Sequence, residues 1–397
     1  MYAVPTKEFE RRLNSLQRLM VSKGLDAVYI NNAVNMAYFV GFYYLQTERP
    51  AAIVIRNNGE IYFFGPLLER DHVMEQTKLI SKVYTYRDYP GETHPIKLFI
   101  EWFRELHLDN SVIGYDSTPG YANYWGYKGP SLTELMPNVK FVNVADDVYS
   151  MRIIKSDVEI ELLRESAKWA NLAHSLLQDY TAPGLYDYEI SLRASLDASL
   201  MMKKALGPQY KPMRSEYPAF AGFRGQVGEH SAYPHSISVE RPIKLGDVLV
   251  TGASADVGGY MAELERNIFV GKPTDKIVKY HEMALRLQDS ALNVLKPGIK
   301  ASEVDGAVIR MAKELGVYEY LLHHSGHGLG LEAHEAPFLD IGDETVLRPG
   351  MVITVEPGIY VPGLGGFRHS DTVVIREDDI EIITYYPRDT ETLTVEI

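Results

Sequence analysis

Apolar residues recur along this chain at two periods, and the two periods separate its expected helices from its expected strands. A period of three to four residues predicts helices over 6–23, 96–106, 157–177, 188–204, 276–295 and 303–315. Short apolar runs predict strands between the first three of these helices, at 27–30, 50–56, 60–64, 82–86, 111–115 and 139–144. Helices that alternate with strands in this way predict an α/β (α+β) protein.

A helix start marks the expected boundary between two domains. Ser156 precedes an apolar-periodic stretch, and Glu159 follows three residues later, which is the pattern of a capping box. We therefore predict an N-terminal α/β domain over residues 1–152 and a second domain over residues 153–397. A chain of 397 residues is long enough for two hydrophobic cores.

The segment 244–271 predicts a hairpin that carries two acidic side chains. Its strands are expected at 248–251 and 260–270, with Gly258 and Gly259 at the turn. Glu263 and Glu265 are two residues apart in the second strand, so both should point to the same face. Two carboxylates in an apolar strand are costly unless a partner neutralises them or the chemistry uses them. We expect the rest of the chain to supply those partners.

Composition narrows the classes of partner. The formal charge of −13 argues against nucleic acid and against an anionic membrane surface. No apolar run is long enough to span a membrane, and the first residues lack the apolar core of a signal peptide. The absence of cysteine excludes disulfides, thiolate metal sites and a cysteine nucleophile. We expect a cytoplasmic protein that acts on a small molecule.

Polar residues that could carry chemistry gather in the second half of the chain, at strand ends next to glycines. Besides the two glutamates of the hairpin, they are His235, His327, His334, Glu356 and His369. Taken singly, such residues are more often explained by packing, a turn or an exposed surface than by catalysis. Their convergence at strand ends favours one shared site. Residues 214–242, rich in glycine, histidine and tyrosine, are expected to loop across it.

Five motifs in family order resemble the "pita-bread" family of methionine aminopeptidase, aminopeptidase P, prolidase and creatinase. They are NMAYFVGF, RIIKSDVEIELLRESA, SGHGLGLEAHEAP, PGMVITVEPGIY and GFRHSDTVVI. The resemblance covers the whole chain. It implies a C-terminal pita-bread domain, in which helices cover an antiparallel sheet with pseudo-two-fold symmetry.

In the family's peptidases, two aspartates, one histidine and two glutamates hold two metal ions. The resemblance places Gly252 and Glu263 at the aspartate positions, His327 at the histidine, and Glu356 and Ser370 at the glutamates. Glycine offers no ligand and serine a poor one, so we expect no metal pair and no cofactor. The alternative is a single divalent ion held by Glu263, His327 and Glu356.

These departures resemble the metal-free creatinase branch. The resemblance implies that His235, Glu265 and Glu356 are catalytic, with His235 as the acid and base. It places Arg49 at an arginine that reaches the active site of the partner subunit in a homodimer. Glu263, His327, His334 and His369 are expected to complete a substrate-binding wall. Other features are closer to prolidase, and His334 matches the peptidases' proton-handling histidine.

Three functions follow from this mixture. The leading hypothesis is a hydrolase that cleaves a C–N bond of a small cationic or zwitterionic amidine, guanidino or amide substrate without a metal pair. Its route, by water attack or by an acyl-enzyme on Glu265, stays open. The alternatives are an Xaa-Pro dipeptidase or aminopeptidase P-like enzyme with a degenerate or single-metal site, and a non-catalytic binding protein.

Overall fold

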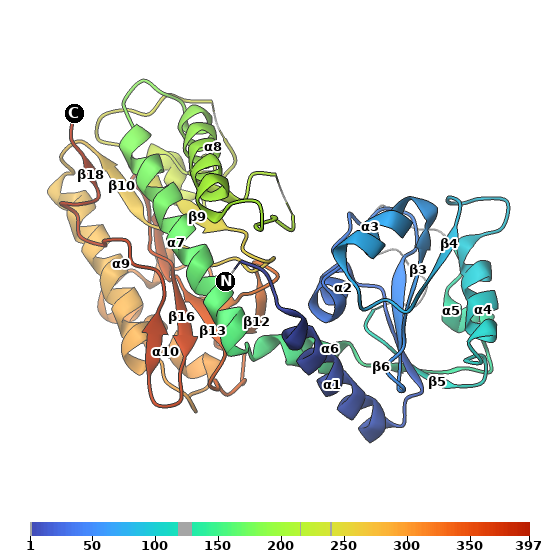
Figure 1. The fold of residues 1–397 in the computed structure, drawn as a ribbon. Helices are drawn as coiled ribbons and strands as arrows, with labels where there is room; N and C mark the ends of the chain where they lie inside the picture. The colour runs from blue at the N-terminus through green and yellow to red at the C-terminus, as the bar shows by residue number, and fades with distance from the viewer. Residues whose placement is uncertain (1, 118–128, 215, 239) are drawn as a thin grey trace. The chain divides into compact units, whose positions relative to one another are not determined.

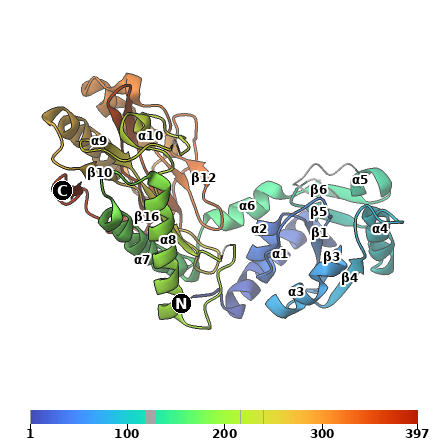
Figure 2. The same ribbon diagram turned by 90° about the horizontal axis from the view of Figure 1, so that it is seen from above.

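The chain folds into two compact units. The computed structural model describes residues 2–117, 129–214, 216–238 and 240–397. One unit comprises Val4–Arg152, and the other comprises Ile153–Ile397 together with the start of the chain (Figures 1 and 2). Each unit combines helices with sheets, which confirms the predicted α/β class. None of the described helices is long and apolar enough to cross a membrane.

The first unit is built on one mixed sheet of six strands in the order β4-β3-β2-β1-β5-β6. A turn at 57–59, with Gly59 as its last residue, joins β2 to β3 as an antiparallel hairpin. Strand β1 pairs antiparallel with β2 and parallel with β5. The strands are β1 (Ala27–Ile30), β2 (Ala52–Arg56), β3 (Ile61–Pro66), β4 (Lys82–Tyr86), β5 (Val112–Tyr115) and β6 (Lys140–Asn143).

Helices border this sheet, and residues typical of helix starts and helix ends mark their limits. Gly24 adopts a left-handed conformation at φ 62° and ends the first helix, and the Asn32 side chain caps the second. Phe64 packs edge-on against Phe99 and Phe103 in the aromatic core. The helices are α1 (Thr6–Lys23), α2 (Ala33–Val40), α3 (Arg70–Gln76), α4 (Pro95–Glu105), α5 (Leu132–Leu135) and α6 (Ala145–Ile153), with a 3₁₀ turn, η1 (Leu67–Glu69).

Four long helices cover the strands of the second unit (Figure 1). Ser156 and Glu159 form the predicted capping box at the start of α7. Ile160, Leu163 and Leu177 are buried on the face of α7 that its apolar period predicted. The helices are α7 (Asp157–Tyr180), α8 (Asp187–Leu206), α9 (Asp275–Val294) and α10 (Ala301–Glu314), with 3₁₀ turns η2 (Gly228–Ala232) and η3 (Tyr318–Tyr320). Helix α7 packs on α8, and α9 packs on α10.

The strands of the second unit form small antiparallel sheets with one parallel edge. The sheets run β18-β10-β8, β12-β11-β13-β16-β17, β14-β15 and β7-β9. The strands are β7 (Ala219–Gly222), β8 (Val248–Val250), β9 (Gly252–Ala255), β10 (Asn267–Val270), β11 (His327–Gly328), β12 (Glu335–Phe338), β13 (Val352–Val355), β14 (Gly358–Val361), β15 (Gly365–Arg368), β16 (Asp371–Ile375), β17 (Ile380–Ile382) and β18 (Thr394–Val395).

The segment that carries the two hairpin glutamates is less regular than predicted. A continuous strand was expected over residues 260–270, but only β10 is regular. Leu264 bridges to Ala253, whereas Glu265 bridges to Ser370, so the segment changes partners within two residues. Because of this switch, the segment lies between β9 and the residues that precede β16. It therefore gathers side chains from both.

Candidate active site

Two adjoining hollows in the second unit share Arg224, Glu263, Glu265 and His334 in their walls. The first, of about 360 Å³, is the polar hollow, and it is lined by Arg224, Pro234, His235, Glu263, Glu265, Leu322, His323, His324, His327, His334, Glu356 and Arg368. The second, of about 230 Å³, is the apolar hollow, and its lining adds Phe220, Ala221, Gly222, Gly252, Ala253, Ser254, Met261, Ala262, Leu329 and Ala333. Both glutamates of the hairpin face these hollows, as their two-residue spacing predicted.

Three side chains of the polar hollow form a compact set of metal donors. One atom each of Glu263, His327 and Glu356 lies within 4.8 Å of the other two. His327 Nε2 is 2.9 Å from Glu356 Oε1. His327 belongs to β11, Glu356 directly follows β13, and β11 pairs with β13. One nitrogen and two carboxylate donors suit a divalent transition-metal ion such as zinc or manganese.

Hydrogen bonds orient each of the three potential metal ligands. The Nδ1 atom of His327 is 2.9 Å from the carbonyl oxygen of Gly328, which fixes the ring and leaves Nε2 toward the other donors. The Ser370 hydroxyl donates to Glu263 Oε1 over 2.7 Å. The Thr354 hydroxyl donates to Glu356 Oε1 over 3.2 Å. A set of donors held in this way is preorganised for an ion.

The pKa values of these three side chains are shifted, as expected for ionisable groups that lie close together in a buried site. Burial, together with the negative charges of Glu356 and Glu265, raises the pKa of Glu263 to about 8. Burial alone would lower the pKa of His327, but its hydrogen bond to Glu356, together with the negative charges of Glu356 and Glu263, raises that pKa to about 9. Burial would raise the pKa of Glu356, but the same bond, together with the positive charges of His327 and Arg368, lowers that pKa to about 2. Without a cation, the set therefore holds two protons at neutral pH.

Glu265 lies in a different electrostatic environment. Arg368 donates from Nη2 to Glu265 Oε1 over 2.7 Å, and its Nε forms a close ion pair with the other carboxylate oxygen. Arg224 donates from Nη2 to the same Oε1 over 3.1 Å. The side chain of Arg368 is 5% exposed, whereas that of Arg224 is 55% exposed. Two guanidinium groups thus neutralise one buried carboxylate.

Histidines form one wall of the polar hollow. The rings of His327 and His334 stack with centroids 3.8 Å apart. Burial lowers the pKa of His334, and the charge of His327 adds to this effect, so the ring is neutral at pH 7. His235 is exposed and lines the same hollow. His323 Nε2 is 2.8 Å from the Tyr360 hydroxyl, which also accepts a hydrogen bond from Arg368.

Two predicted site residues lie elsewhere. His369 is fully buried, and its Nε2 is 3.3 Å from Nδ1 of His281, so it does not belong to the substrate-facing wall that we expected. The physical reason is strand alternation, because its neighbour Ser370 is the residue that points toward Glu263. Arg49 belongs to the first unit, where it forms ion pairs with Glu48 and Asp88. Its action in a partner subunit stays a prediction.

Sequence reasoning missed the two arginines on Glu265. Arg368 lies in the motif GFRHSDTVVI, in which only the neighbouring histidine and serine were expected at the site. Arg224 lies in the segment 214–242, of which 215 and 239 fall outside the described residues. A signal was available, since Arg224 lies two residues after the short strand β7 and precedes a glycine. Its contact with Glu265, 41 positions away, could not be derived from that signal.

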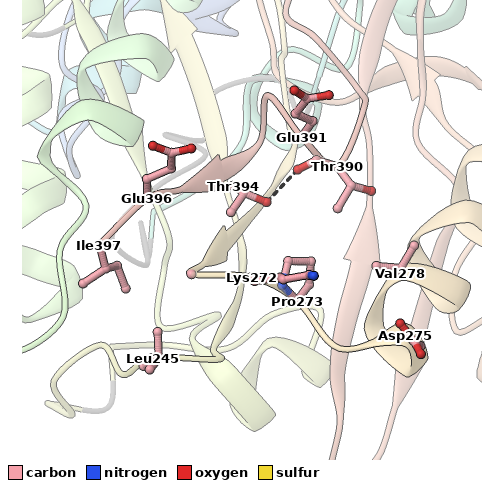
Figure 3. A pocket seen from close by; sticks show the side chains of 11 residues that line it. Leu245, Lys272, Pro273, Asp275, Val278, Thr390, Glu391, Thr394, Glu396 and Ile397 are labelled. Atoms are coloured by element: carbon pink, nitrogen blue, oxygen red, sulfur yellow. Dashed lines mark hydrogen bonds between the residues drawn. The ribbon is translucent and has the colours of Figure 1, made fainter.

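A larger hollow, of about 800 Å³, lies near the C terminus and shares no residue with the other two (Figure 3). Glu391, Glu396 and Lys272 stand around it, and the Thr394 hydroxyl bonds to the carbonyl oxygen of Thr390. Among the residues that the structure describes, no histidine and no compact set of metal ligands lines it. Size alone therefore does not identify the active site of this protein.

Comparison with known proteins agrees with this geometry. Residues 161–377 match the model of metallopeptidase family M24, and residues 12–154 match the Creatinase/Prolidase N-terminal domain. The chain is 32% identical to the Xaa-Pro dipeptidase of Pyrococcus furiosus over 96% of this chain and 99% of that protein. The Pyrococcus horikoshii prolidase structure superposes with a TM-score of 0.77 at 28% identity, over 96% of this chain and 99% of that one. The Xaa-Pro dipeptidase structure from Bacillus anthracis gives 0.78 at 26%, with the same coverage. These neighbours confirm the pita-bread fold.

The comparison corrects one prediction. We expected no cofactor because two of the five family ligand positions hold Gly252 and Ser370, but the matching family is one of metallopeptidases, so this expectation is wrong. Losing two ligands removes the donors of a metal pair, whereas three donors within 4.8 Å of one another remain. The hydrolase assignment holds, and the peptidase alternative agrees better with the relatives than the creatinase-like hypothesis does. The chain belongs to metallopeptidase family M24.

Proposed function

We propose that this protein is an Xaa-Pro dipeptidase-like peptidase that works with one divalent metal ion per chain. The observation that carries the proposal is the cluster of Glu263, His327 and Glu356, whose donor atoms lie within 4.8 Å of one another in a metallopeptidase fold. A relative at 32% identity over nearly the whole chain is named an Xaa-Pro dipeptidase, which supports the substrate class.

The ion would be held by Glu263, His327 and Glu356. When bound, it supplies Lewis acidity that polarises a peptide carbonyl group. The remaining steps belong to the side chains around it. His334 is neutral at pH 7 and stacks on His327, so its ring can accept a proton from water and return it to the leaving nitrogen. His235 faces the same hollow and is the second candidate for this proton transfer.

Glu265 serves a different purpose in this scheme. Its carboxylate is saturated by Arg368 and Arg224, so it holds the two guanidinium groups in place and is not available as an additional ligand. This arrangement disfavours the acyl-enzyme route on Glu265, one of the two routes that the sequence left open, because a carboxylate in two ion pairs is a weak nucleophile.

The test is hydrolysis of Ala-Pro and Gly-Pro by the full-length protein, first stripped with a chelator and then reloaded with zinc, manganese or cobalt. We expect hydrolysis of the dipeptides to return when metal is added back. The rate of hydrolysis should be lower for the tripeptide Ala-Pro-Gly than for the dipeptides. The absence of hydrolysis with every metal would contradict the proposal. Sedimentation of the same sample, with an Arg49→Met variant assayed alongside, tests the predicted homodimer and the role of Arg49 in it.

A further inference from the structure

The position that lacks a metal ligand, Gly252, faces a cation of the protein itself. A Cβ built on Gly252 would lie 3.5 Å from Oε1 of Glu265 and 4.0 Å from Nε of Arg224. Apart from its chain neighbours, it would meet no closer atom of the described residues. A carboxylate carried by such a Cβ would therefore lie beside the guanidinium group of Arg224.

A tight turn holds Arg224 in this place. Its central residues, Arg224 and Gly225, both have positive φ, at 51° and 72°, and the amide of Gln226 donates to the carbonyl oxygen of Phe223 over 2.8 Å. This backbone conformation is costly for a residue other than glycine, so the surrounding structure must impose it. The buried Asp187 contributes, because its carboxylate accepts from the amide of Gly225 over 3.1 Å. The turn is thus anchored on the first residue of α8.

The side chain of Arg224 is fixed at one end and open at the other. Its Nη2 atom donates to Oε1 of Glu265 over 3.1 Å and to Oε1 of Gln226 over 3.4 Å. Its Nε and Nη1 atoms have no hydrogen-bond partner within the described parts of the chain. The side chain is 55% exposed and lines both hollows. Arg224 therefore places a permanent positive charge in the wall that Glu263 also lines.

The charges of the polar hollow suit one metal ion and not two. Among the described residues that line it, the carboxylates are Glu263, Glu265 and Glu356, and the lysine or arginine side chains are Arg224 and Arg368 alone. When all three carboxylates are ionised, the two guanidinium groups leave one negative charge. One divalent ion turns this into one positive charge, whereas two ions would leave three positive charges in a largely buried site, which is strongly unfavourable.

We propose that the guanidinium group of Arg224 takes the place of a second metal ion. The resemblance to the family's peptidases implies a carboxylate ligand for that ion at the position of Gly252. Here the ligand is absent, and a protein cation stands beside the bare glycine. The site therefore carries a second cation that needs no metal loading, and it stays mononuclear. This inference rests on the proposed function only in taking Glu263, His327 and Glu356 as the place of the first ion.

The test counts manganese ions in chains that regain the missing carboxylate. Native mass spectrometry and calorimetric titration with MnCl2 are applied to full-length Gly252→Asp and to the double variant Gly252→Asp/Arg224→Met. We expect Gly252→Asp to keep one ion, because the new carboxylate pairs with Arg224, and the double variant to bind two. The second ion should bind the double variant at least about tenfold more tightly than Gly252→Asp, the size of one hydrogen bond to a charged group.

Three further variants separate charge from shape. Gly252→Asp/Arg224→Lys retains the positive charge and should keep one ion. Gly252→Asn/Arg224→Met has nearly the shape of the double variant but lacks the carboxylate, so it should also keep one. Gly252→Asp/Arg286→Met removes an exposed arginine of α9 and should match Gly252→Asp. If Gly252→Asp does not fold, Arg224→Glu, which reverses the charge beside Gly252, should acquire the second ion by itself.

Equal affinity of the second ion for Gly252→Asp and for the double variant would overturn the inference. A double variant that binds a single ion would overturn it too, because something other than Arg224 would then close the position. Either result leaves the proposed function intact if wild type hydrolyses Ala-Pro. Two ions in the double variant, with no hydrolysis of Ala-Pro by wild type, would instead contradict the peptidase and support the role of Arg224.

Discussion

Two glutamates that stand two residues apart in one segment are neutralised in opposite ways. Glu265 has two arginines, one of them fully buried with it. Glu263 has a serine hydroxyl and, among the described residues, no ion pair with lysine or arginine. Its carboxylate instead faces Glu356 and His327, and burial raises its pKa to about 8. The contrast shows that the protein supplies its own cations on one side only; on the other side the proposed metal ion would supply the positive charge.

The largest expected effect comes from removing the nitrogen ligand. His327→Ala should lose the bound metal and lower kcat/KM for Ala-Pro by about 10³-fold or more, because the Lewis acid contributes several kcal/mol to the transition state. Metal content by mass spectrometry and initial rates are the measurements. His107→Ala, in the first unit, is the control and should keep both. A His327→Ala protein that retains its metal would show that the donor set is misassigned.

Glutamine substitutions at the two glutamates separate a structural carboxylate from a ligand. Glu265→Gln leaves the buried charge of Arg368 without its partner and should lower the free energy of unfolding of the metal-free protein by about 3–5 kcal/mol. Glu263→Gln mimics a carboxyl that is already protonated at pH 7, so it should change that stability by less than about 1 kcal/mol while abolishing metal binding. Urea denaturation of both variants measures the difference. Equal losses of stability in the two variants would contradict the assignment of Glu265 as a structural carboxylate and Glu263 as a metal ligand.

The pH dependence of metal affinity sharpens the same point. The raised pKa values of Glu263, about 8, and His327, about 9, mean that both hold protons at neutral pH, and the ion must displace them. Affinity should therefore rise between about 10- and 100-fold for each pH unit below pH 8 and level off above pH 9. Titration calorimetry in buffers of different ionisation heat measures the released protons. An affinity that stays constant between pH 6 and pH 8 would contradict this protonation scheme.

The smallest expected effect is at Ser370. Its hydroxyl donates to Glu263 and does not replace the ligand that the family places there, so Ser370→Ala should weaken metal binding by about tenfold and leave the stoichiometry unchanged. Competition with a chromogenic chelator gives the affinity. Loss of the ion altogether would identify the serine as a ligand in its own right.

The sequence predicted the local elements and the face of the glutamates, because capping residues and a period of two act over short distances. The capping box at Ser156 and the shared face of Glu263 and Glu265 are examples. It did not predict what stands opposite those side chains. Arg224 reaches Glu265 from the turn that follows β7, and His369 points away from the site by one step of strand alternation.

The metal prediction failed for a related reason. Counting ligand positions along the chain showed two losses, at Gly252 and Ser370, and therefore favoured a site without metal over a single ion on the three remaining ligands. In space, the three surviving donors form a complete set on one side, while arginines and an apolar hollow occupy the other. The spacing of residues in the sequence shows which metal ligands are present, but it does not show which side of the site each of them occupies.

The number of metal ions bound per chain tests this account most directly. The full-length protein, stripped and then dialysed against excess zinc or manganese, should retain one tightly bound ion by native mass spectrometry. The same measurement on Glu263→Gln, His327→Ala and Glu356→Gln should give none. Two ions per chain in the wild-type protein, or an ion that survives in all three variants, would contradict the central claim.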